Sequence, residues 1–126
     1  MIDKIILVFI ACLFAHYIAD YILQTNFVAR FKCKETWALE YPQAIYRNDY
    51  KAMLVVHSLS WAIVTLLPLY LMVNNNAKLY LGAIEINTII HYIVDDFKAN
   101  KKKISLIVDQ IIHLIQILLT MAIYFL

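Results

Sequence analysis

The sequence is short of the residues on which soluble domains and secreted scaffolds depend. Its 126 residues include one glycine, two prolines and two cysteines, and only 16% of them are charged. Two cysteines cannot build a disulfide framework, so we expect Cys12 and Cys33 to be free thiols. A soluble domain usually carries about a quarter charged residues, and a net charge of +2 is too small to indicate a nucleic-acid-binding surface. These absences argue against a soluble domain, a disulfide-rich domain and a nucleic-acid-binding protein.

Apolar residues make up 63% of the chain, and they gather in four long stretches. A helix that is apolar all round is a membrane span or the core of a larger protein, and this chain is too short for the second. About 20 helical residues cross a bilayer, so the short third stretch, Leu79–Val94, requires Asp95 near the interface or a thinner bilayer. We predict an all-α membrane protein in which a single domain, residues 1–126, forms a four-transmembrane-helix bundle. The predicted spans are residues 2–23, 52–73, 79–96 and 104–126.

The connections between the predicted spans differ in length and charge. The long first connection, residues 24–51, is rich in aromatic and charged residues, which predicts an amphipathic segment on the membrane surface that Pro42 breaks in two. Lysine and arginine are concentrated in the first and third connections, whereas the opposite side has only Lys4 and Lys78. The positive-inside rule therefore places both basic connections in the cytoplasm and both termini outside. We expect the basic connections to contact anionic membrane lipids.

Seven ionisable side chains lie inside the predicted spans, where each is costly unless it is paired, hydrated or bound to metal. Six of them form pairs four residues apart, so each pair occupies one stripe of its helix. Because the spans alternate in direction, all seven reach the same depth, near the cytoplasmic face. The seven are His16, Asp20, His57, His91, Asp95, Asp109 and His113. Their convergence predicts a single polar layer.

The two halves of the chain resemble each other around this layer. The peptide His-Tyr-Ile-Ala-Asp at 16–20 is nearly identical to His-Tyr-Ile-Val-Asp at 91–95, and each is followed by a helix that carries a histidine. We predict two pseudo-symmetric helical hairpins, related by an axis along the membrane normal. Met53, one turn before His57, stands where the second half has Asp109, so the symmetry is broken at one position.

Imidazole and carboxylate groups on facing bundle helices are a common source of metal sites. No cysteine takes part, which favours zinc, manganese or iron over a softer metal. Four histidines and three aspartates exceed what one tetrahedral ion needs, and they suit two ions about 3.5–4 Å apart with a bridging carboxylate. Asp109 is the natural bridge or extra ligand, and Met53 leaves one coordination position for water or substrate.

Two alternatives to a metal stay open from the sequence. The layer can be a metal-free polar network, which includes a proton relay between histidine and aspartate. Haem would need only two facing histidines. It would not require an aspartate four residues from each histidine, so the pattern argues against haem.

Four polar residues flank the layer, and most of them can be interpreted in two ways. Gln24, Gln110 and Gln116 are candidates to orient the metal ligands through hydrogen bonds, and Gln24 and Gln116 are equally compatible with simple helix–helix contacts. Lys98 can receive an anionic or substrate group, or it can extend to the cytoplasmic interface.

The ordered motifs resemble those of a known family. They are His16-x-x-x-Asp20-x-x-x-Gln24, His57 in the second span, His91-x-x-x-Asp95-x-x-Lys98 and Asp109-Gln110-x-x-His113. Over essentially the whole chain, this set resembles a bacterial and phage membrane protein family of unknown function, domain-of-unknown-function family 3307. The motifs are also distantly similar to those of inner-membrane proteins classified as metal-dependent hydrolases. The resemblance implies a bacterial or phage origin and an inner-membrane location, and it implies no substrate.

The leading functional hypothesis is a membrane-embedded, metal-dependent hydrolase that acts at the cytoplasmic leaflet. Its substrate would be an ester or phosphoester of a lipid or a lipid-linked molecule, with Asp20, Asp95 and Asp109 as the catalytic carboxylates. One alternative is an ion, proton or metal transport protein that uses the same layer. Another is a phage accessory protein that binds a host membrane partner and holds a structural metal. A homodimer is compatible with each hypothesis, because four short helices shield a charged site poorly from lipid.

Overall fold

The computed structural model describes residues 1–126. Its regular structure is all helix: 83% of the residues lie in helices, and there is no strand. Four long helical segments form a bundle, and three short helices lie in the first connection. In chain order the elements are α1 (Ile2–Tyr17), η1 (Ile18–Leu23), α2 (Asn26–Phe31), α3 (Lys34–Glu40), η2 (Ala44–Tyr46), α4 (Asp49–Met72), α5 (Ala77–Ala99) and α6 (Leu106–Phe125). The all-α prediction is confirmed.

Three of the long segments are long and apolar enough to cross a membrane. They are Ile2–Leu23, Ala44–Met72 and Leu106–Phe125. Large apolar side chains, among them Phe14 and Leu119, point outward from these segments, as expected for helices that face lipid. The segment α5 has the required length but carries Lys78, Glu85 and Asn87, so a fourth span stays a prediction.

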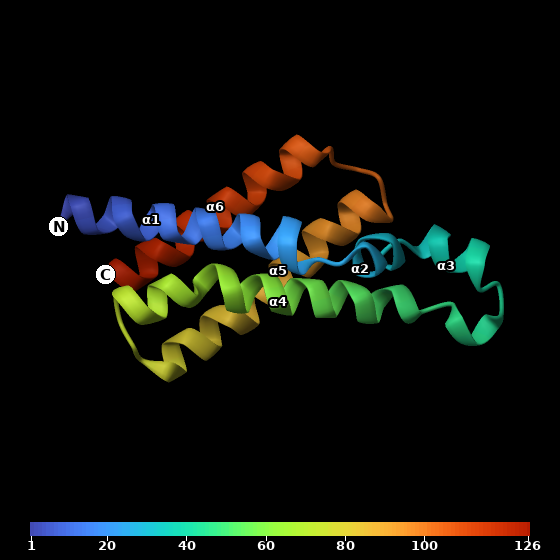
Figure 1. The fold of residues 1–126 in the computed structure, drawn as a ribbon, viewed down its shortest axis with the longest axis horizontal. Coiled ribbons are helices and arrows are strands. Elements are labelled where there is room, and N and C mark those ends of the chain that lie inside the picture. The colour runs from blue at the N-terminus through green and yellow to red at the C-terminus, as the bar shows by residue number, and fades with distance from the viewer.

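The long segments alternate in direction, as Figure 1 shows. Both termini and the short turn between α4 and α5 lie at one end of the bundle, which we call the terminal end. The helices α2 and α3 and the connection after α5 lie at the other end, which we call the connection end. The helix α4 contacts α1, α5 and α6, so it joins the other three long segments.

The interior is apolar toward the terminal end. Eleven buried residues pack there into one cluster, which includes Val8, Trp61, Leu66, Ile117 and Met121. Nearer the connection end, the interior positions of the same helices are polar. The bundle is therefore divided along its length into an apolar core and a polar site.

The first connection is helical and is interrupted near Pro42, as the sequence predicts. The hydroxyl of Thr25 caps α2 by accepting from Val28 N at 3.2 Å, and Pro42 lies between α3 and η2. This connection does more than lie on a surface, because α2 packs against α4. Phe31 and Lys32, at the C-terminal end of α2, are buried.

The two repeated peptides differ in backbone conformation. The first runs from α1 into η1, a π-helix in which Gln24 N donates to Ala19 O across five residues. The second lies wholly within the regular helix α5. The backbone around Asp20 is therefore a π-helix, whereas the backbone around Asp95 is a regular α-helix. The two-fold relation between the halves stays a prediction.

Candidate metal centre

The structure brings all seven ionisable residues of the predicted layer into one connected cluster. Each is linked to at least one other by a contact of 3.9 Å or less. The side chain of Asp20 is the most exposed of the seven, at 11%. The sequence therefore identified which residues meet, and their separate positions define what each can do.

One set of ligand atoms surrounds the Nε2 atom of His57. That atom lies 3.2 Å from His91 Nε2, 3.5 Å from Asp20 Oδ1 and 3.4 Å from Asp95 Oδ2. Ligands of a tetrahedral Zn²⁺, bound at about 2.0–2.1 Å, lie about 3.3–3.4 Å from one another. Asp20, His57 and His91 therefore form a group that could hold a metal ion.

A second potential group contains His91, Asp95 and His113. Here Asp95 Oδ1 lies 3.9 Å from His113 Nε2, while its other oxygen faces His57. The rings of His91 and His113 stack with centroids 4.0 Å apart. Asp95 thus presents one carboxylate oxygen to each group. The sequence suggested Asp109 as a bridge or an extra ligand, and its Oδ1 lies beside the second group, 3.3 Å from His113 Nε2.

His16 belongs to the cluster but to neither metal-binding group. Trp61 Nε1 donates to His16 Nδ1 at 2.7 Å, so the proton of the imidazole is on Nε2. That nitrogen lies 3.1 Å from Gln110 Oε1. Both ring nitrogens are therefore occupied, and His16 is a hydrogen-bonding support for the site. Sequence analysis did not select Trp61, although it lies one turn after His57.

Two lysines enter the cluster from the connection end. Lys32 Nζ lies 2.8 Å from Asp95 Oδ2 and donates to Gln24 Oε1 at 3.0 Å. Lys98 Nζ lies 2.8 Å from Asp109 Oδ2 and 3.4 Å from Asp95 Oδ1. From the sequence, Lys32 was one of several lysines and arginines in the first connection. Nothing in its local pattern shows that α2 packs against α4.

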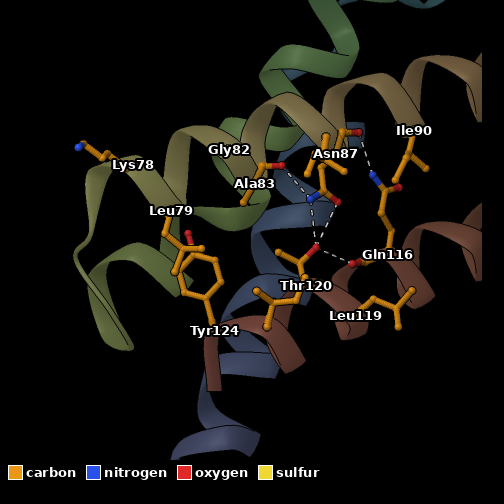
Figure 2. A pocket seen from close by; sticks show the side chains of 12 residues that line it. Lys78, Leu79, Gly82, Ala83, Asn87, Ile90, Gln116, Leu119, Thr120 and Tyr124 are labelled. Atoms are coloured by element: carbon orange, nitrogen blue, oxygen red, sulfur yellow. Dashed lines mark hydrogen bonds between the residues drawn. The ribbon is translucent and has the colours of Figure 1, made fainter. Parts of the chain in front are cut away.

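The three candidate supporting glutamines all contact the cluster. Gln24 accepts from Lys32, and Gln110 Nε2 donates to Asp109 Oδ2 at 3.0 Å. Gln116 Oε1 lies 3.3 Å from His113 Nδ1, and its Nε2 donates to Asn87 O at 2.8 Å. Gln116 thus combines the two roles that its sequence position left open, since it both supports a histidine and joins α6 to α5 (Figure 2).

The unsatisfied atoms of the cluster test whether these residues fit a metal ion. Asp20 Oδ1, Asp109 Oδ1 and His113 Nε2 are buried and have no hydrogen-bond partner. Orphaned acceptors of this kind are costly in a buried setting. With Gln116 accepting at His113 Nδ1, the lone pair of Nε2 faces carboxylate oxygens. A cation beside His113 would satisfy Asp109 Oδ1 and His113 Nε2, which lie 3.3 Å apart. Another beside His57 would satisfy Asp20 Oδ1, which lies 3.5 Å from His57 Nε2, so the donor set fits divalent metal.

A cavity of about 70 Å³ opens beside the cluster. Its lining includes Asp20, Gln24, Lys32, Lys98 and Gln110, so small polar molecules reach the site from the connection end. Cys33 lies next to this region, and burial raises the pKa of its thiol. A protonated thiol is a poor metal ligand. Both cysteines are free, as predicted, and neither is in a potential metal group.

Comparison with known proteins identifies a family but no activity. No curated protein and no solved structure matches the chain, so the distant similarity to metal-dependent hydrolases stays a prediction. A family model described as a protein of unknown function (DUF3307) matches residues 8–126. The match covers all seven cluster residues and the two lysines that contact them. The chain therefore belongs to the DUF3307 family of proteins of unknown function.

Proposed function

We propose that this protein is a membrane-embedded, metal-dependent hydrolase of a lipid or lipid-linked ester or phosphoester. The supporting observation is the arrangement of three potential ligand atoms 3.2–3.5 Å from His57 Nε2. That spacing suits a divalent ion, and the second group around His113 suits another. Asp95, which has one oxygen toward His57 and the other toward His113, would help to hold both ions, and Asp109 would support the second beside His113.

The residues of the chain have separate roles in the proposed reaction. A bound divalent ion would supply a Lewis acid and activate water at neutral pH. Asp20 lines the cavity and is the most exposed carboxylate of the cluster, so it is placed to accept a proton from the attacking water. His16 is held by Trp61 and by Gln110, and it lines the side of the cluster next to Asp20.

Charge favours an anionic substrate. The cluster has three carboxylates and two lysine ammonium groups, so with neutral histidines its net charge is one negative unit. One divalent ion makes the site positive, and two make it strongly positive. Lys32 and Lys98 line the cavity where a substrate would enter. These charges favour a phosphoester over a neutral carboxylic ester.

The direction of approach follows from the proposed topology. With the basic connections in the cytoplasm, the cavity opens toward the cytoplasmic leaflet of the membrane. A lipid head group there can reach the site laterally, while its chains stay in the bilayer. The proposal places both termini on the opposite side, in a bacterial inner membrane.

Metal analysis is the first test of the proposal. We expect detergent-purified protein to contain one or two zinc, manganese or iron ions per chain. His91→Ala is expected to lose stoichiometric metal, because His91 belongs to both groups. Asp109→Ala should retain more, because Asp109 contacts only His113 of the second group. The measurement is elemental analysis by mass spectrometry.

The control for this test is His16→Asn, because His16 lies in the cluster but its nitrogens are already occupied. It should keep its metal if it folds. Native and metal-reconstituted protein that both lack stoichiometric metal would contradict the proposal. Ligand variants that fail to fold would instead favour a structural metal in an accessory protein. Folded, metal-free and inactive variants, assayed on lipid phosphoesters in mixed micelles, would support catalysis.

Transport of ions or protons is a second candidate, and one observation favours it. A buried hydrogen-bonded run extends from His113 through Gln116 to Asn87 and Thr120, toward the terminal end. Beyond it the interior is closed by apolar residues such as Leu66 and Met121. Ion or proton flux into proteoliposomes would support transport, and hydrolysis on the same vesicles without flux would support the enzyme.

A further inference from the structure

An elongated groove lies between α5 and α6, outside the metal centre. It has a volume of about 410 Å³, and Figure 2 shows it between the two helices. On α5 its lining steps along one face through Lys78, Gly82, Ile86 and Ile90. Because these residues are four apart, they form one continuous stripe. The facing wall comes from α6, with Leu119 and Ile123 among its residues.

The shape of the groove depends on the single glycine of the chain. A Cβ atom added at Gly82 would meet nothing within 4 Å, so helix packing does not require a glycine there. Glycine costs about 1 kcal/mol relative to alanine inside a helix. The absence of a side chain at Gly82 therefore leaves open space in the groove, and no contact within the protein requires that space.

The two ends of the groove differ in chemistry. At the inner end, Asn87, Gln116 and Thr120 are hydrogen-bonded to one another and to the backbone, so they leave few groups for a polar ligand. At the outer end, Lys78 is exposed and forms no ion pair. It lies in the first turn of α5, where the helix dipole is also positive. Glu85 lies on the same helix but does not line the groove.

We propose that this groove binds one acyl chain of an anionic membrane lipid, with the lipid phosphate at Lys78. The stripe from Lys78 to Ile90 is about 18 Å long at 1.5 Å per residue, which suits an extended chain. The apolar walls accommodate the chain, and the lysine with the positive helix end attracts the head group. This site lies toward the terminal end, so it is separate from the substrate cavity at the connection end.

The test is lipid retention measured by native mass spectrometry. Protein reconstituted in vesicles of equal parts phosphatidylglycerol and phosphatidylcholine is extracted in mild detergent. We expect one phosphatidylglycerol to be retained per chain, several-fold in excess of phosphatidylcholine. Gly82→Leu should fill the groove and lower lipid retention at least fivefold. It should still fold, because leucine is a better helix former than glycine and its Cβ meets no neighbour.

Two further variants separate the chain from the head group. Lys78→Gln should abolish the preference for phosphatidylglycerol while one lipid is still retained. Leu81→Phe is the matched control, because Leu81 is 64% exposed and does not line the groove; its retention should equal that of the wild type. Unchanged retention in Gly82→Leu, or no head-group preference in the wild type, would overturn the proposal. So would a dimer that Gly82→Leu converts to monomers, since a second copy would then occupy the groove.

Discussion

Asp95→Asn is expected to abolish metal binding and to lower the free energy of unfolding by about 3–5 kcal/mol. Asp95 is 1% exposed and contacts the ammonium of Lys32 and three histidines. Removing one partner of a buried ion pair leaves the other charge uncompensated, which costs about 3–5 kcal/mol. The measurements are elemental analysis and thermal or denaturant unfolding in detergent.

The neighbouring aspartate provides a matched control. Asp96 has a side chain that is 18% exposed, and its ion pair is with the surface residue Lys101. Asp96→Asn makes the same chemical change one residue away, on another face of α5. It should keep its metal and lose no more than about 1 kcal/mol, as is usual for surface ion pairs. Equal effects of the two variants would show that Asp95 has no special role.

Lys32→Met is expected to tighten metal binding while destabilising the metal-free protein. Lys32 is 7% exposed and occupies Asp95 Oδ2, the oxygen that faces His57. Without the lysine, a metal ion no longer competes with an ammonium group for this oxygen. We expect the affinity for the metal ion to rise about tenfold, equivalent to about 1.4 kcal/mol. Calorimetric titration with Zn²⁺ measures the affinity. The melting temperature should rise more on metal addition in the variant than in the wild type.

Lys34→Met is the control for this experiment, since Lys34 lies two residues away and is exposed. It should leave both metal affinity and stability unchanged. If Lys32→Met binds metal more weakly than the wild type, Lys32 supports the site and does not compete with the ion. A metal-free variant as stable as the wild type would show that the Lys32–Asp95 pair has no net stabilising effect.

The composition and location of the cluster could be predicted because they follow from simple geometry. Alternating helices of similar length bring His16 and His91, near the ends of two of them, level with His57 and His113, near the starts of the others. Spacing of four residues then places Asp20 and Asp95 on the same stripes as their histidines. The apolar composition fixed the environment in which these groups had to pair.

The finer arrangement of the site could not be predicted from sequence. The position of Lys32 depends on how α2 packs against α4, and local pattern carries no information on that packing. Which aspartate lies between the two histidine groups depends on helix rotation, which the spacing of residues leaves undetermined. The π-helix η1 also has no clear sequence signal, although it sets the position of Asp20. Such π-bulges occur often at functional sites.

The division of the bundle into an apolar core and a polar site also bears on how the helices reach their relative heights as the bundle assembles. Two apolar helix surfaces set their relative height only weakly, because apolar contacts are not directional. The link between His16 on the first helix and Gln110 on the last spans 94 residues, and the Lys32–Asp95 pair spans 63. A slip of one helix by one turn, about 5.4 Å, would break every such link that this helix makes. The cluster therefore holds the long helices at fixed heights relative to one another, and the His16–Gln110 link can form only after α6 has packed against α1.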